Sequence, residues 1–98
     1  MNFAATVSFT MKNGKSEDYK KLYIELKKVG LDHELEGGQR KVNLPETTVY
    51  GKYIGESVEA VRDHVREEVK KTYKTLKLSG EFFVAVGGEL TTWGHNTV

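Results

Sequence analysis

The 98-residue sequence has no cysteine and one proline, and its 15 basic and 14 acidic side chains leave a net charge of +1. Without cysteine there are no disulfides, thiolate metal sites or cysteine nucleophile, which favours a cytoplasmic protein. No apolar run approaches the roughly 20 residues of a membrane span, and the first residues do not form a signal peptide. The near-zero net charge excludes a strongly basic protein that coats nucleic acid, and it excludes a strongly acidic protein that mimics nucleic acid.

The first third of the chain predicts a strand followed by a helix. Residues 3–9 alternate between apolar and small side chains, as a half-buried strand does. After a short loop, Ser16 is the expected N-cap of a helix that ends near Gly30, a plausible C-terminal cap. The apolar side chains at helical spacing are Tyr19, Leu22, Tyr23, Leu26 and Val29.

The middle of the chain predicts two more strands with a basic loop between them. Alternation at 31–35 indicates a short strand, which two glycines end, and residues 47–54 are rich in strand-forming side chains. The glycine-rich loop carries Arg40 and Lys41. Gly51, inside the later strand, is expected to mark a bulge or a close approach of two backbones.

A second helix and a last strand complete the pattern. Ser57 is the expected N-cap of this helix, and several valines, Tyr73 and Leu76 form one apolar stripe along the helix. Residues 81–86 predict an apolar strand, which we expect to be central or covered. The tail at 89–98 contains the single tryptophan, Trp93.

This order of elements predicts an α+β fold, a two-layer ferredoxin-like βαββαβ sandwich with a C-terminal tail strand. We expect a single domain over 1–98, in which the tail at 89–98 pairs with a partner subunit. Two helices cover one face of the sheet, so the other face is open or covered by a partner. Alternation places on this open face Thr6, Ser8, Thr10, Tyr50, Lys52, Phe83 and Ala85.

The open face favours a homodimer over an RNA-stacking platform. RNA recognition motifs stack bases on aromatic side chains of the two central strands, whereas the first strand here offers only threonine and serine. Small neutral side chains suit close packing against a second sheet. We therefore expect a dimer interface made by Thr6, Ser8, Tyr50, Phe83 and Trp93. The plain alternative is a solvated face.

Basic side chains gather in two groups that suit a phosphate backbone. The first is the loop pair Arg40 and Lys41, and the second lies near the end of the second helix and comprises Lys70, Lys71, Lys74 and Lys77. The alternative for the second group is a solvated helix end, where the helix dipole favours cations. Because acids elsewhere offset the charge, we expect weak, salt-sensitive binding of RNA or DNA.

The histidines give no strong catalytic or metal-binding pattern. His33 and His64 are the candidates for acid–base chemistry, but their spacing is not that of metal ligands. The alternative for His64 is a surface ladder of ion pairs, because Asp63 and Glu67 share one helical face beside Arg62 and Arg66. We expect no metal site and no cofactor.

Three stretches carry a family resemblance: residues 44–51 (LPETTVYG), 61–65 (VRDHV) and 80–88 (GEFFVAVGG), the last leading toward Trp93. The pattern resembles small bacterial and phage proteins related to the CRISPR adaptation endonuclease-like fold, and its layout is similar to the endoribonuclease antitoxin of type V toxin–antitoxin systems. The resemblance implies a ferredoxin-like dimer whose sheets face each other. The nuclease members end the first strand with an aspartate that binds a divalent metal across the dimer, whereas this sequence has Ser8 or Thr10 there.

Three functions follow for comparison. The first is a dimeric, non-catalytic nucleic-acid-associated protein of a mobile-element, toxin–antitoxin or phage-defence system. The second is a protein-interaction module that binds partners through a sheet edge or the tail. The third is a weak, metal-independent endoribonuclease in which His33 or His64 acts as acid or base. We rank them in this order.

Overall fold

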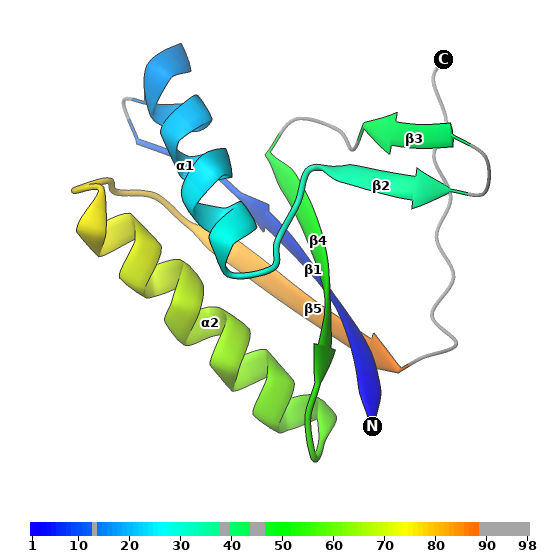
Figure 1. The fold of residues 1–98 in the computed structure, drawn as a ribbon. Helices are drawn as coiled ribbons and strands as arrows, with labels where there is room; N and C mark the ends of the chain where they lie inside the picture. Colours follow the sequence, from blue (N-terminus) through cyan, green and yellow to red (C-terminus); the bar gives the residue numbers. More distant parts are fainter. Residues whose placement is uncertain (13, 38–39, 44–46, 89–98) are drawn as a thin grey trace.

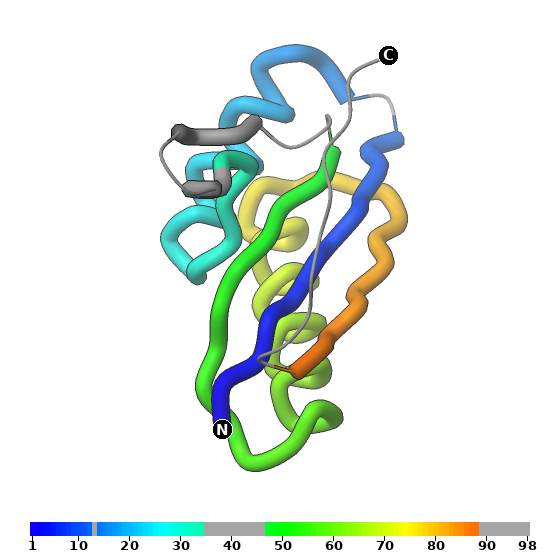
Figure 2. The backbone as a smooth tube through the Cα atoms, turned by 90° about the vertical axis from the view of Figure 1, so that its right-hand side faces the viewer, coloured from blue at the N-terminus to red at the C-terminus, as the bar shows by residue number. Residues whose placement is uncertain are grey.

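An antiparallel sheet with helices on one face forms the body of the protein (Figure 1). The computed structural model describes residues 1–12, 14–37, 40–43 and 47–88, with the backbone alone at 35–37 and 40–43. In these ranges, β1 (Asn2–Phe9) lies between β4 (Thr48–Ile54) and β5 (Phe82–Gly88), and both pairings are antiparallel. Figure 2 views these strands from the open face, with α1 (Ser16–Lys28) and α2 (Val58–Thr75) behind them. The expected two-layer α+β class is therefore confirmed.

The hydrophobic core fills the space between the sheet and the helices. The predicted alternation of β1 is confirmed, because Phe3, Ala5, Val7 and Phe9 are buried while Thr6 and Ser8 are exposed. The helices contribute buried side chains from their predicted apolar stripes, which are Leu22, Leu26, Val61, Val65 and Val69. Leu31 and Val49 complete the core. Burial of these side chains supplies the main stabilising free energy, at about 1.5–3 kcal/mol for each large one.

The first helix begins one residue earlier than predicted and ends where expected. Lys15, not Ser16, is the N-cap, and the Lys15 backbone N–H donates to the Asp18 carboxylate at 3.0 Å. At the other end, Gly30 has a φ of 95°. Its N–H donates to the Lys27 carbonyl at 3.1 Å, as the Schellman motif requires of a residue in this position. Glycine adopts this left-handed conformation without steric cost.

The second helix starts at the predicted cap and ends on an unusual residue. The Ser57 hydroxyl oxygen accepts a hydrogen bond from the Ala60 N–H at 3.1 Å, which satisfies one free donor of the first turn. At the C-terminal end, Lys77 has a φ of 57°, and its N–H donates to the Lys74 carbonyl at 3.1 Å. Lys77 thus takes the place that glycine usually fills in this type of helix ending.

The predicted second strand of the main sheet is largely wrong. Only Asp32 bridges to β4, through two backbone hydrogen bonds with Tyr50 of 2.9 and 2.8 Å, among the residues that the structure describes. The chain then forms β2 (Glu34–Gly37), which pairs with β3 (Arg40–Asn43) in a separate hairpin. Arg40 and Lys41 therefore lie on a strand and not in the expected loop. A local hairpin closes a shorter loop than pairing along β4, which lowers the entropic cost.

The last strand is at an edge of the described sheet, and α2 covers its inner face, so of the two expectations the strand is covered and not central. In the described chain β5 pairs with β1 alone. The Thr10 N–H donates to the Glu81 carbonyl at 2.7 Å, and the antiparallel register continues from this pair. The backbone groups of Phe82, Val84 and Val86 therefore point away from β1. The apolar sequence arises because α2 packs over the helix-side valines, while Phe83 faces outward.

Candidate nucleic-acid interface

The lysines at the end of α2 are exposed, and most of them have no ion-pair partner among the described residues. Lys70 lies 3.9 Å from a Glu67 carboxylate oxygen. For Lys71, Lys74 and Lys77, no ion pair is found in the described part of the chain. The apolar side of this segment is buried as predicted, with Tyr73 only 6% exposed. The helix thus directs its positive charges into solvent, where they are free to contact an anion.

The other basic pair lies elsewhere in the molecule. Arg40 and Lys41 belong to the β2–β3 hairpin, which Figure 1 shows beyond the β4 edge, whereas α2 packs near β5 on the opposite side. The structure therefore does not bring the two predicted basic groups together.

Tyr73, near the end of α2, bonds to the chain after β1 and lies within electrostatic reach of Tyr19 on α1. The Tyr73 hydroxyl donates a 2.8 Å hydrogen bond to the Thr10 carbonyl, which ties α2 to the end of β1. Burial of the ring, and secondarily the neighbouring Tyr19, raises the pKa of Tyr73 from 10.0 to about 12. Tyr73 therefore stays protonated and remains a hydrogen-bond donor throughout the neutral pH range.

A pocket of about 410 Å³ opens beside the first turns of α1. Its lining residues are Gly14, Ser16, Tyr19, Tyr23 and Thr47. The Thr47 N–H donates to the Tyr23 hydroxyl oxygen at 2.9 Å, and Thr47 has a φ of 63°, which is rare for a β-branched residue. The sequence predicts both tyrosines as members of the apolar stripe of α1, and it does not predict the pocket. Their i, i+4 spacing does indicate that the two rings share one side of the helix.

The two candidate histidines lie apart. His33 packs on Tyr23 with ring centroids 4.7 Å apart, and its Nδ1 is 3.6 Å from an Asp32 carboxylate oxygen. His64 contacts Tyr53 with centroids 5.9 Å apart. Since Tyr23 bonds to the residue before β4 and Tyr53 lies near the end of β4, the length of that strand separates the histidines. The two imidazoles cannot act together as an acid–base pair.

Beside His64, the expected surface ladder of charges is present. Asp63 accepts from Arg62 at 3.0 Å and lies 3.8 Å from Arg66. Tyr53 donates to the Val29 carbonyl at 2.7 Å. Burial, with a smaller contribution from the Glu68 charge, raises the pKa of Tyr53 to about 12. The groups around His64 are therefore accounted for by surface ion pairs and by the contact with Tyr53.

The open sheet face contains the predicted side chains in adjacent rows. The register places Thr6 between Tyr50 and Ala85, and Ser8 between Thr48 and Phe83. Large apolar side chains interrupt this small-residue surface, because Phe83 is 69% exposed and Ile54 is 84% exposed. Of the predicted interface residues, Trp93 lies outside the described residues.

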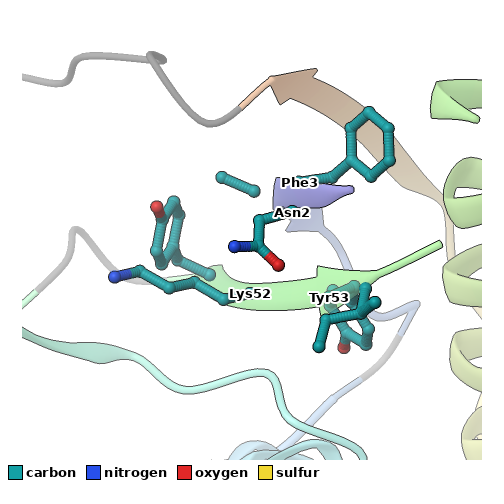
Figure 3. Close-up of a pocket in the computed structure, with 7 residues that line it drawn as sticks. Asn2, Phe3, Lys52 and Tyr53 are labelled. Carbon is teal, nitrogen blue, oxygen red and sulfur yellow. The ribbon is translucent and has the colours of Figure 1, made fainter.

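A second pocket, of about 350 Å³, lies where β1 begins and β4 ends (Figure 3). Asn2 and Lys52 extend into the same region, and Tyr50 and Ile54 also line it. Lys52 stands opposite Ala4 in the register, so the pocket is continuous with the open face. Any surface that packs on that face also meets this pocket.

Within the described ranges, no group of three or more histidine, aspartate or glutamate side chains is arranged to hold a metal ion. Neither described helix combines the length and apolar character of a membrane span. Comparisons with protein-family models, curated proteins and solved structures find no significant match.

Proposed function

We propose that this protein is a homodimeric, non-catalytic nucleic-acid-binding protein. The observation that carries the proposal is the group of exposed lysines at the end of α2, of which Lys71, Lys74 and Lys77 have no ion-pair partner in the described residues. Each lysine that contacts a phosphate releases counterions, so even a small group supports salt-sensitive binding. A role in a mobile-element, toxin–antitoxin or phage-defence system is the setting that the family resemblance implies.

The fold that we propose for this function is ferredoxin-like. The order β4-β1-β5, with Asp32 bridged to the outer side of β4, is compatible with the 4-1-3-2 order of that fold. In this interpretation the second strand is reduced to one bridge, and the β2–β3 hairpin is an added element.

The open face supports the dimer. Thr6 and Ser8 present small side chains that suit close packing against a second sheet, and a partner would bury the exposed Phe83 and Ile54. Two copies joined through this face would leave both α2 helices on the outside. Their lysines would then remain accessible in the dimer.

The test is the salt dependence of nucleic-acid binding. A variant with Lys71→Gln, Lys74→Gln and Lys77→Gln is compared with wild type on one fluorescent oligonucleotide between low and physiological salt. The slope of log affinity against log salt should become shallower by roughly 0.9 per lost contact on duplex, or 0.7 on single strands.

A matched variant controls for net charge. Lys21→Gln, Lys27→Gln and Lys28→Gln remove the same charge from exposed positions on α1. The control should keep most of the wild-type slope. Equal slopes for all three proteins would mean that the α2 lysines are a solvated helix end, and no binding by wild type at low salt would reject the function.

A second candidate function is a protein-interaction module that binds a partner strand at β5. In the described sheet β5 is an edge strand, and it has neither the charged residues nor the proline that usually protect an edge from pairing. An added strand would bond to the outward backbone groups of Phe82, Val84 and Val86. A peptide copying residues 82–88 should then slow hydrogen exchange at these amides. In Val84→Pro, which lacks the central outward N–H, Phe82 and Val86 should lose this protection; no protection in wild type would reject the candidate.

A further inference from the structure

We propose that the pocket beside the start of α1 binds a base of a single-stranded nucleic acid, with the rings of Tyr19 and Tyr23 as its stacking surface. This inference rests on the proposed nucleic-acid function and specifies the form of the ligand. Every base has a flat π-face, so stacking on tyrosine suits a binder that does not select sequence.

The pocket has the size and the lining that a base requires. Its volume of about 410 Å³ lies within the usual range of small-molecule sites, which is about 300–1,000 Å³. Tyr19 and Tyr23 are one helical turn apart, so both rings leave the same side of α1. Ser16 adds a hydroxyl group to the lining, which is able to bond to the polar edge of a base.

Tyr23 is held in position before any ligand arrives. Its hydroxyl oxygen accepts the Thr47 N–H at 2.9 Å, and its ring meets Phe9 edge-on with centroids 5.8 Å apart. His33 packs against the ring at 4.7 Å. Thr47 is itself held by the Phe9 N–H, which donates to its carbonyl at 3.0 Å. A preorganised ring loses little conformational entropy on binding, which increases affinity.

Positive charge lies at the same end of the molecule as the pocket. Tyr19 neighbours Tyr73, and Lys74 and Lys77 follow Tyr73 at the end of α2. Lys15 is exposed immediately before α1. The nearby Asp18 carboxylate accepts the Lys15 N–H. The end of the molecule at which α1 starts and α2 ends (Figure 1) thus combines an aromatic pocket with cations for the adjoining phosphates.

Single strands fit this arrangement better than duplexes. A duplex keeps its bases stacked inside, so a base reaches a side pocket only at the cost of unstacking. A single strand presents its bases without that cost, and its backbone can bend from the pocket toward the α2 lysines. Lysine contacts to phosphates alone would give no preference for single strands over duplexes.

The experiment measures binding of a 12-nucleotide single-stranded RNA, the same DNA sequence and its duplex by fluorescence anisotropy. Tyr19→Leu should weaken single-strand binding by about 5- to 150-fold, the equivalent of one lost base stack, and should leave duplex binding nearly unchanged. Tyr19→Phe keeps the ring and should bind like wild type. His64→Leu, which removes an exposed ring from α2 outside both the pocket and the open face, is the matched control and should also bind like wild type.

A measurement on wild type guards against a misfolded variant. Light-induced cross-linking of an oligonucleotide that carries 5-iodouracil should form its adduct at Tyr19 or Tyr23, as identified by mass spectrometry. Adducts only at other residues, or an unchanged single-strand affinity in folded Tyr19→Leu, would overturn the base pocket while the lysine salt slope still supports the proposed function. Weakening by His64→Leu but not by Tyr19→Leu would place the base contacts outside the α1 pocket. If wild type bound no oligonucleotide at low salt, both proposals would fall.

Discussion

Gly51 of β4 packs directly against the carbonyl group of Gly30 at the end of α1, and a Cβ atom on Gly51 would overlap that carbonyl oxygen. The left-handed turn at Gly30 brings the end of α1 onto the sheet. Gly51 is fully covered there, opposite Ala5 of β1. The two glycines therefore set how closely the first helix approaches the strands.

Replacing Gly51 with alanine should destabilise the protein by about 3 kcal/mol, because a backbone carbonyl cannot move aside as a side chain can. Chemical denaturation of the variant measures the change in unfolding free energy. Gly88→Ala is the control, since a Cβ there meets no atom of the described residues within 4 Å, and it should change stability by less than about 0.5 kcal/mol. Similar stabilities for both variants would contradict the close approach.

Lys77→Gly should stabilise the protein by about 1 kcal/mol, because Lys77 has a φ of 57° and a left-handed conformation penalises residues with a Cβ atom. Lys77→Gln removes the same charge without relieving the backbone, so its stability should stay close to wild type. Thermal denaturation compares the three proteins. A Lys77→Gly variant no more stable than Lys77→Gln would show that the turn is not strained.

Stability should fall as pH rises from about 10 to 12. Folding raises the pKa of Tyr73 from 10.0 to about 12, so the folded state holds a proton that the unfolded state releases. The stabilisation is complete below pH 10 and is lost as pH passes the folded pKa. After allowance for solvent screening, the effect is on the order of 1 kcal/mol.

Tyr73→Phe provides the comparison for this pH dependence. It also lacks the hydrogen bond to Thr10, so it should be less stable at neutral pH. Unfolding by urea at several pH values should show a smaller decline above pH 10 for the variant. If the unfolding free energies of the two proteins declined in parallel above pH 10, Tyr73 would not be the source of that decline.

Phe83→Ser should weaken the proposed dimer about 10-fold or more, because a large side chain that is 69% exposed in one chain becomes an interface anchor. Ile24→Ser, at a 59% exposed apolar residue on α1, should leave self-association unchanged. Sedimentation equilibrium gives both dissociation constants. A wild-type mass of 11.1 kDa at tens of micromolar would refute the dimer.

Addition of Mg²⁺ or Mn²⁺ should produce no cleavage of RNA or DNA. The end of β1 offers the hydroxyl groups of Ser8 and Thr10, whereas Mg²⁺ is usually held by carboxylates together with water or substrate phosphates. Gel assays with each metal, and with EDTA as control, give the answer. Metal-dependent products that disappear in EDTA would show that other groups bind the ion.

Periodicity and end signals in the sequence predicted much of the local structure. The alternation of residues 3–9 predicted β1, and the cap at Ser57 with its apolar stripe predicted α2. Both signals act between residues close in the chain, through strand pleating and helix hydrogen bonding. The sharing of one face by Thr6, Tyr50 and Phe83 followed from the same alternation.

Contacts between distant segments decided the rest. Asp32 makes a single bridge to β4 before the chain turns into a hairpin, a choice between two pairings of similar local propensity. The position of β5 at an edge likewise depends on which strand finds β1.

The pocket between Tyr23 and Thr47 joins residues 24 positions apart, so no short-range pattern reveals it. The sequence by itself determined both helices, β1, β4 and β5, and which side of each is apolar, because those preferences are local. The tertiary structure alone decided which edges stay open and which polar groups meet, because these depend on the global competition between pairings.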